Sequence, residues 1–180
     1  MPFHSLGLDP RLLQSVAAQG YTLATPIQKT IPASLAGRDV MGLAQTGTGK
    51  TAAFVLPLLQ RLLSGPRRQL RALIVGPTRE LAEQTRDVIE KLGAGLGLRC
   101  VTIYGGVGPR PQIAGIRQGA EIAIACPGRL LDHLRQNQFN LNQVECLILD
   151  EADRMFDMGF LPDIRQILKR LPARRQTLLF

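Results

Sequence analysis

The chain has 180 residues, of which 45% are hydrophobic and 20% charged, so it is long enough for one globular domain with a buried core. These proportions exclude a disordered or fibrous protein, and no apolar run approaches the roughly 20 residues of a membrane span. The formal net charge of +8 favours a polyanionic partner such as nucleic acid.

Histidine and cysteine are too few and too scattered for a multi-ligand metal centre or a disulfide framework. The histidines are His4 and His133, and the three cysteines, Cys100, Cys126 and Cys146, form no CxxC pair. The amino terminus carries no apolar leader segment. We therefore expect a cytoplasmic protein without membrane association, because thiols stay reduced in that compartment, and we expect a monomer.

Short apolar runs alternate along the chain with segments that have the spacing of an amphipathic helix. In chain order, the sequence predicts a helix over 10–19 capped by Asp9, a short helix beginning at 25–28, and a strand over 40–43. The segment 105–120 is punctuated by proline and glycine and is predicted to be a connection. The other predicted helices are 51–63, 81–92, 127–136 and 160–171, and the other predicted strands are 70–75, 98–104, 121–125, 146–149 and 176–180.

Strands that are apolar throughout and alternate with amphipathic helices are typical of a parallel sheet covered on both faces. The expected fold class is therefore α/β, with three layers in the order α/β/α and a mostly parallel central sheet. Ligands in such folds bind beyond the carboxyl ends of the strands. The segments 63–68 and 93–97 are predicted to be turns within one domain of residues 1–180.

A glycine-rich segment, Ala44–Thr51 (A-Q-T-G-T-G-K-T), lies between a predicted strand and a predicted helix. Glycines let successive backbone N–H groups converge on phosphate oxygens, and the helix start adds its positive dipole end. Lys50 is expected to reach the β and γ phosphates, and the Thr51 hydroxyl to bind Mg²⁺. The alternative is a strand-to-helix turn with an incidental lysine. The expected nucleotide contacts are Thr46, Gly47, Thr48, Gly49, Lys50 and Thr51.

Two adjacent carboxylates, Asp150 and Glu151, follow the apolar run 146–149, at the carboxyl end of a predicted strand. An aspartate at this place can hold the Mg²⁺ shell, and a neighbouring glutamate can orient and deprotonate an attacking water. By itself an acidic segment is more often a solvated turn or a helix start. Together with the phosphate loop, it predicts a site that hydrolyses a nucleoside triphosphate, with Lys50, Asp150 and Glu151 as its catalytic residues.

Several motifs together resemble the DEAD-box family of ATP-dependent RNA helicases. Residues 150–153 read D-E-A-D, and the phosphate loop has the form found in that family, including its initial Ala44. Further segments resemble the family's other motifs in the family's order: 20–28 the Q motif, 77–82 motif Ia, 105–106 the glycine doublet and 126–129 motif Ib. The resemblance implies a RecA-like P-loop NTPase lobe, with a Q-motif region over 1–36 and the core over 37–180.

The resemblance also implies how the adenine of ATP would be recognised. Gln28 would hydrogen-bond the adenine edge, and the aromatic residues Phe3 and Tyr21 would pack near the ring. An amide can serve adenine in a bidentate way, so the chemistry is plausible. The alternative is structural, because Thr25-x-x-Gln28 is also a capping box and Phe3 can be an anchor of the core.

Motifs Ia, GG and Ib are implied to bind the RNA backbone, which positions a strand without reading its sequence. Their alternatives are a helix cap at Thr78 and a solvated cation at Arg129. Cys126 stands where the family usually has threonine, and a thiol is a weak hydrogen-bond donor. The implied RNA-binding residues are Pro77, Thr78, Arg79, Gly105, Gly106, Gly128 and Arg129.

Asp153 is implied to couple the acidic motif to the Ser-Ala-Thr motif, which the family pattern places after Phe180, and thereby to a second lobe absent from this chain. This lobe alone is expected to bind ATP and hydrolyse it poorly, since the second lobe supplies an arginine finger. The start Phe3–Leu8 resembles bacterial RhlE-like members. Two alternatives stay open: a non-catalytic, nucleotide-gated RNA-binding module, and another P-loop NTPase or translocase.

Overall fold

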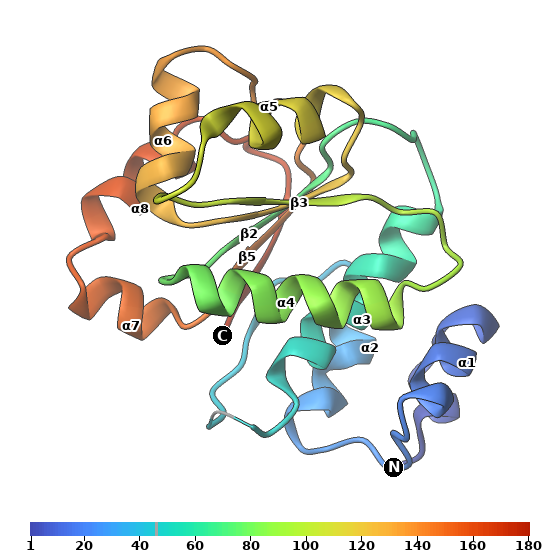
Figure 1. Ribbon diagram of the computed structural model, residues 1–180. Helices are drawn as coiled ribbons and strands as arrows, with labels where there is room; N and C mark the ends of the chain where they lie inside the picture. Colours follow the sequence, from blue (N-terminus) through green and yellow to red (C-terminus); the bar gives the residue numbers. More distant parts are fainter. Residues whose placement is uncertain (46) are drawn as a thin grey trace.

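A computed structural model describes residues 1–45 and 47–180, and its centre is one six-stranded sheet in the order β1-β6-β5-β2-β4-β3 (Figure 1). Each neighbouring pair of strands is parallel, so every strand directs its carboxyl end to the same edge of the sheet. The strands are β1 (Val40–Met41), β2 (Ala72–Val75), β3 (Cys100–Ile103), β4 (Ile122–Ala125), β5 (Cys146–Leu149) and β6 (Gln176–Leu179).

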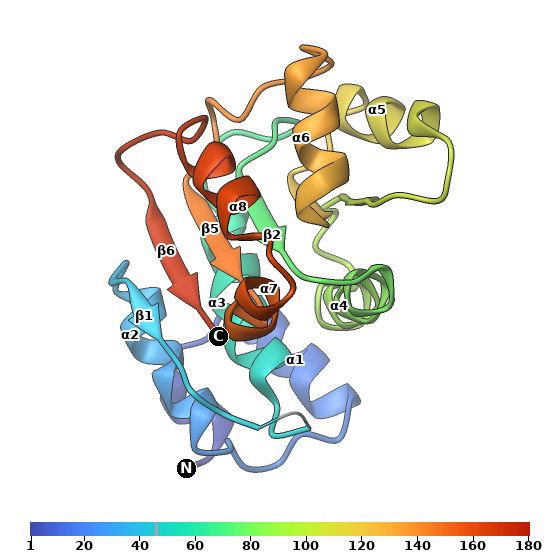
Figure 2. The ribbon, with the colours of Figure 1, turned by 90° about the vertical axis from the view of Figure 1, so that its left-hand side faces the viewer.

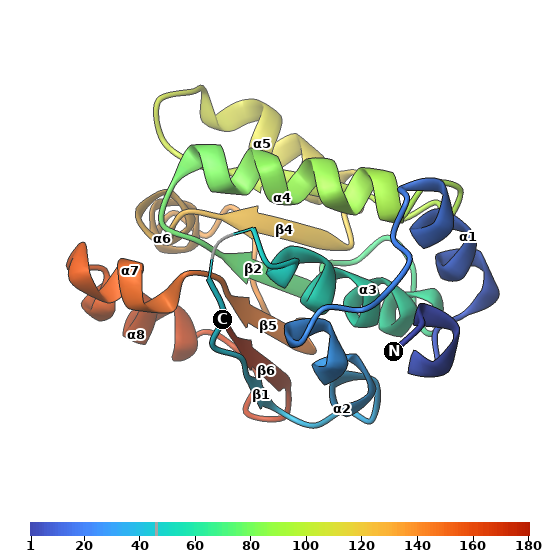
Figure 3. The same cartoon turned by 90° about the horizontal axis from the view of Figure 1, so that it is seen from below.

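Helices cover both faces of this sheet, as the sequence predicts. In Figure 1, α3 and α4 lie below the sheet and α5 and α6 lie above it, and Figure 3 looks onto the face covered by α3 and α4. The α-helices are α1 (Pro10–Ala18), α2 (Ile31–Leu35), α3 (Lys50–Leu63), α4 (Arg79–Leu92), α5 (Pro109–Arg117), α6 (Pro127–Arg135), α7 (Ala152–Asp157) and α8 (Leu161–Leu168), with 3₁₀ turns η1 (Phe3–Leu6) and η2 (Ile27–Thr30).

The buried strands divide their side chains between two hydrophobic cores. On β2, Ile74 packs in the core beneath α1–α4, whereas Leu73 and Val75 pack in the core beneath α6–α8. On β5, Ile148 and Leu147 divide in the same way. This two-residue alternation explains why the strands are apolar throughout, because both faces of the sheet are buried.

Besides shifts of one to three residues at the ends of other elements, the structure differs from the sequence-based expectations at three places. The segment predicted to be a connection contains α5, which begins at Pro109, a residue favoured in the first turn of a helix. A short helix, α7, follows the acidic pair. The first strand ends at Met41 rather than residue 43, because β1 is at the edge of the sheet and Leu43 is 92% exposed. Within the described residues, no helix has the length and apolarity needed to cross a bilayer.

A buried arginine ties the end of α3 to the start of β2. Arg71 is 3% exposed, and its guanidinium donates to the carbonyl oxygens of Leu62 and Pro66 at 3.2 and 3.1 Å. It also pairs with the Glu145 carboxylate at 2.8 Å. Carbonyls at a helix carboxyl end have no partner within the helix, so Arg71 satisfies groups that would otherwise be buried without a donor.

We expect Arg71→Met to lower the free energy of unfolding by about 2–3 kcal/mol, because several buried carbonyls lose their donor while the aliphatic volume remains. Urea denaturation measures the change. The matched control is Glu145→Gln, which should cost less than about 1 kcal/mol because the Glu145 side chain is 37% exposed and an amide oxygen still accepts from Arg71. Equal losses in both variants would contradict the carbonyl-capping role.

Candidate active site

The phosphate loop connects the end of β1 to the start of α3. Gly47 and Gly49 have φ of +82° and +85°, a left-handed conformation that favours glycine. The Thr48 hydroxyl donates to the carbonyl oxygen of Gln45 at 2.6 Å, which holds the turn. Lys50 is the first residue of α3, so the loop ends at a helix amino terminus, as anion binding requires. Thr46, also predicted to contact nucleotide, lies outside the described residues.

Gln28 joins the Q-motif segment to this loop through a buried amide. Its Oε1 accepts from the Thr25 backbone N–H at 2.9 Å, and its Nε2 donates to the Gly49 carbonyl oxygen at 3.2 Å. The first bond is half of the capping box; the Thr25 hydroxyl has no partner among the described residues. An amide oxygen accepts twice and an amide nitrogen donates twice, so Gln28 keeps one acceptor and one donor position for a ligand.

The two aromatic residues of the Q-motif region differ in accessibility. Phe3 is 4% exposed and belongs to the core beneath α1–α4, whereas Tyr21 is 38% exposed. Their rings are stacked, with centroids 6.0 Å apart and planes inclined by 20°. Phe3 therefore has the position of a core anchor, and Tyr21 presents the accessible aromatic surface.

The two residues of the acidic pair follow β5 and lie in different environments. Asp150 is 3% exposed; burial raises the pKa of its carboxyl to about 6, an increase that the nearby Lys50 charge opposes. Glu151 has φ +52°, which is unusual for a residue with a side chain and marks the sharp turn between β5 and α7. Its carboxylate pairs with Arg154 at 3.0 Å, and the Arg154 side chain is 57% exposed.

One pocket of about 400 Å³ brings the loop and the acidic pair together. Its lining includes Gly47, Lys50 and Thr51 from the loop and both Asp150 and Glu151 from the other segment. The pocket therefore combines a helix amino terminus, an ammonium group and two carboxylates, which is the set that a metal-bound polyphosphate needs. The residues predicted separately from two segments about 100 positions apart lie in a single cleft.

The oxygen groups of this pocket fit a hard divalent cation. Asp150 supplies a buried carboxylate; burial raises the pKa of this carboxyl, so a bound cation would stabilise its charged form. Thr51 supplies a hydroxyl from the first turn of α3. Mg²⁺ typically binds one or two protein oxygens and takes its remaining ligands from water and substrate phosphate. Asp150 and Thr51 are therefore suitable residues to hold Mg²⁺ in this pocket.

Three residues of α4 also line this pocket, and the sequence pattern does not assign them to it. Leu81 and Val88 fit the helical spacing of a buried stripe and were interpreted only as core residues, but both line the pocket with Gln84. The spacing places all three on one face of α4. Helical spacing alone does not predict that this face of α4 lies beside the phosphate loop.

Asp153 lies on α7 outside the pocket that the loop shares with Asp150 and Glu151. Its side chain is exposed and accepts from the Arg154 backbone N–H at 2.8 Å. It lines a neighbouring surface pocket of about 540 Å³ with Ala44, Lys50 and Glu151. The coupling role predicted for Asp153 stays a prediction, and its location next to the loop and the acidic pair is suited to that role.

The predicted RNA-binding residues of motif Ia follow β2. Pro77 is buried, and Thr78 caps α4 by accepting from the Leu81 backbone N–H at 3.3 Å. Arg79 is exposed, and its guanidinium lies 4.9 Å from the centroid of the Tyr104 ring. Of these three residues, Arg79 is the one with a charged group available to a phosphate.

The remaining RNA candidates follow β3 and β4 at the same sheet edge. Gly105 and Gly106 are exposed, and a Cβ added to either would meet no atom within 4 Å. The space beside Gly128 is equally open, so backbone N–H groups can be approached there. Arg129 donates to the Val107 carbonyl oxygen at 3.0 Å. Burial raises the pKa of the half-buried Cys126 thiol to about 11, so this thiol stays protonated at neutral pH.

We expect Asp150→Asn to stabilise the nucleotide-free protein by about 2 kcal/mol at neutral pH, because the folded state then no longer buries an uncompensated charge. The Asp150 carboxyl has its pKa raised from an ordinary 3.8 to about 6, so the wild type loses stability relative to the variant as pH rises through this interval. Below about pH 4 the two proteins should have equal stability. Thermal melts across pH test this; a difference that persists at low pH would contradict it.

We expect Gly49→Ala to destabilise the nucleotide-free protein by about 1–2 kcal/mol more than Gly47→Ala. Both positions have left-handed φ, so both variants share the backbone strain. Only at Gly49 would a Cβ lie 2.4 Å from Gln28 Nε2, whereas nothing lies within 4 Å at Gly47. Chemical denaturation without nucleotide compares the two variants. Equal losses in the free energy of unfolding would show that the Gln28 side chain can move away from the added methyl group without destabilising the protein.

Comparison with known proteins identifies the family. The family model described as DEAD/DEAH box helicase matches residues 25–180. ATP-dependent RNA helicase CshA of Listeria monocytogenes is 47% identical over 179 residues, which cover 99% of this chain and 34% of that protein. ATP-dependent RNA helicase RhlB of Xanthomonas oryzae is 48% identical over 188 residues, covering 99% of this chain and 33% of that protein.

A solved structure of a DEAD box protein from the hyperthermophile Methanococcus jannaschii superimposes with a TM-score of 0.93 at 38% identity. The match covers 100% of this chain and 49% of that one. The chain thus spans about a third of the length of the curated relatives it matches. Their likeness extends over the phosphate loop, the acidic pair and the strand-end segments described above, and the chain belongs to the DEAD/DEAH box helicase family.

Proposed function

We propose that the chain is the ATP-binding lobe of an ATP-dependent RNA helicase, which uses ATP hydrolysis to remodel RNA duplexes or RNA–protein complexes. The observation that carries this proposal is the single pocket lined by Gly47, Lys50, Thr51, Asp150 and Glu151. The names of the relatives CshA and RhlB, both ATP-dependent RNA helicases, support the assignment of substrate and partner.

In this proposal each pocket residue has one task in hydrolysis. Lys50 and the backbone N–H groups of the loop bind the β and γ phosphates. Mg²⁺ held by Thr51 and Asp150 would neutralise negative charge on the phosphate oxygens. Glu151 accepts a proton from water as the water oxygen bonds to the γ phosphorus and the bond to the bridging oxygen breaks, which yields ADP and phosphate. The Arg154 pair with Glu151 is largely exposed, so it can exchange readily.

Adenine recognition is assigned to the Q-motif residues next to the loop. Gln28 has one donor and one acceptor position left after its bonds to Thr25 and Gly49, which matches the complementary pair on the adenine edge. Tyr21 lines the nucleotide pocket and offers an aromatic surface to the base. Phe3 supports Tyr21 from the core by stacking against it.

RNA binding is assigned to the segments that follow β2, β3 and β4, at the carboxyl ends of these strands. Arg79, Arg129 and the open backbone at Gly105, Gly106 and Gly128 are suited to contact a sugar–phosphate backbone without reading bases. Asp153 is assigned the coupling to a second lobe, whose arginine would complete the hydrolytic site, so this lobe alone should turn over slowly. We place the protein in the cytoplasm as a monomer; the free thiols of Cys100, Cys126 and Cys146 agree with a reducing compartment.

We expect calorimetry on this chain to show Mg-ATP binding at least about tenfold tighter than Mg-GTP, because guanine presents the wrong edge to Gln28. Lys50→Ala should weaken ATP binding by about 10–100-fold through loss of a charged phosphate contact. Glu151→Gln, the matched variant, should keep ATP affinity and abolish the slow turnover. Equal GTP affinity would favour another P-loop NTPase, and turnover unaffected by Glu151→Gln would favour a non-catalytic role for the acidic pair.

A further inference from the structure

Two of the candidate RNA-binding segments, motif Ia and the glycine doublet, meet at Tyr104, the residue between β3 and the Gly105–Gly106 turn. The Tyr104 ring lies beneath the Arg79 guanidinium at 4.9 Å, and its hydroxyl donates to Glu83 on α4. Its main-chain carbonyl oxygen accepts from Gln112 Nε2 on α5 at 2.9 Å. Tyr104 therefore links the glycine turn both to α4 and to α5.

The Gln112 amide continues this connection to α6. Its Oε1 lies 3.0 Å from His133 Nε2, so a chain of hydrogen bonds runs from Tyr104 O through Gln112 to His133. A carbonyl oxygen can only accept, which fixes the orientation of the amide with its nitrogen toward Tyr104. The amide oxygen then faces His133, which must carry its proton on Nε2.

The connection is fully inside the protein. Gln112 is 4% exposed and His133 is 2% exposed, and the His133 ring packs 5.7 Å from the ring of Phe139. Burial lowers the pKa of His133, and the Arg129 charge lowers it further, so the neutral ring is favoured at physiological pH. Buried polar groups are costly when unpaired, so these two bonds specify how α5 and α6 sit against the glycine turn.

A second, exposed bond joins the same two segments. Arg129, one turn before His133 on α6, donates to the carbonyl oxygen of Val107 just after the glycine doublet at 3.0 Å. Because this bond is exposed and uses only Nη1 of the guanidinium, a phosphate can compete with Val107 for Arg129 or bind its other N–H groups. The buried bonds through Gln112 do not involve a solvent-exposed group, so they can keep the turn in place while Arg129 changes partner.

We propose that Gln112 and His133 are positioning residues for RNA binding: together they hold the Gly105–Gly106 turn at a fixed place relative to Arg129 and Gly128 on α6. This inference rests on the proposed function, because it assigns a purpose to the geometry of the RNA-binding half of the site. Neither residue is accessible to RNA, so both act through the segments that they hold.

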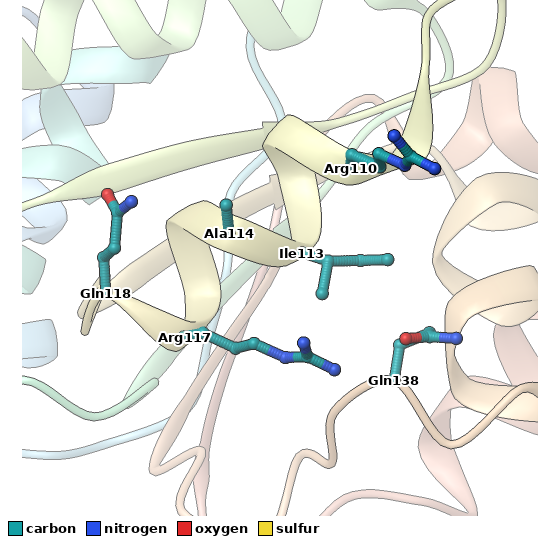
Figure 4. Close-up of a pocket in the computed structure, with 6 residues that line it drawn as sticks. All are labelled: Arg110, Ile113, Ala114, Arg117, Gln118 and Gln138. Carbon is teal, nitrogen blue, oxygen red and sulfur yellow. The ribbon is translucent and has the colours of Figure 1, made fainter.

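The test is Gln112→Leu, which keeps a side chain of similar size and removes both hydrogen bonds. Fluorescence anisotropy with a labelled single-stranded oligouridine at low salt should show binding about tenfold weaker, the size of loss typical when an orienting partner is removed. Affinity for Mg-ATP measured without RNA should stay within about twofold of the wild type. The matched control is Gln118→Leu at the C-cap of α5, where Gln118 is exposed and lines a surface pocket with Ile113 and Arg117 (Figure 4); it should leave both affinities unchanged.

A second variant keeps the test decisive if Gln112→Leu folds poorly. His133→Phe preserves an aromatic ring beside Phe139 and removes the donor to Gln112, and it should weaken oligouridine binding in the same direction. In either background, Arg129→Ala should reduce affinity less than it does in the wild type, because the two segments are no longer aligned. Variants that bind oligouridine like the wild type, or that lose ATP and oligouridine affinity equally, overturn the proposal. A wild type that binds ATP but no oligouridine would instead refute the proposed function.

Discussion

The pairing of β6 between β1 and β5 is the constraint on which the nucleotide site depends (Figure 2). Backbone hydrogen bonds from Gly42 N to Leu179 O and from Phe180 N to Leu149 O fix the carboxyl ends of β1 and β5 relative to β6, which lies between them. The phosphate loop follows β1, and the acidic pair follows β5. Parallel pairing aligns both ends at one edge, so Lys50 and Asp150 face one pocket.

Buried polar side chains differ in their hydrogen bonding between the amino ends and the carboxyl ends of the strands. At the amino ends of the strands, three side chains are buried and hydrogen-bonded to backbone groups of α2, α3 and the segment before β3: Gln176, Arg71 and Glu121. At the carboxyl ends, Asp150 is buried with a raised pKa and Gln28 has unused hydrogen-bonding positions. Groups satisfied within the protein stabilise the fold, whereas groups left incompletely satisfied are available to a ligand.

Under the proposed function, the carboxyl ends of the strands also offer a connection between the nucleotide site and the RNA-binding segments. The neighbouring strands β2 and β5 end in motif Ia and in the acidic pair, and Asp150 N donates to the carbonyl oxygen of Val75. Under the proposed function, a rearrangement of the turn at Glu151, whose φ is +52°, would have a short path through this bond to the start of α4. On the far side of β2, Tyr104 and Gln112 extend the connection to α5 and α6.

The α/β class, the bounds of β5, and the phosphate-loop and acidic segments can all be predicted without the structure. They depend on local periodicity and on spacing between neighbouring residues. The tertiary structure was needed to show that Phe3 lies in the core while Tyr21 is exposed, that α4 contributes Gln84 to the pocket beside the phosphate loop, and that β1 ends at Met41. It also decided the pairing of Gln112 with His133. Burial and hydrogen bonding between distant segments follow from strand order, which no local pattern encodes.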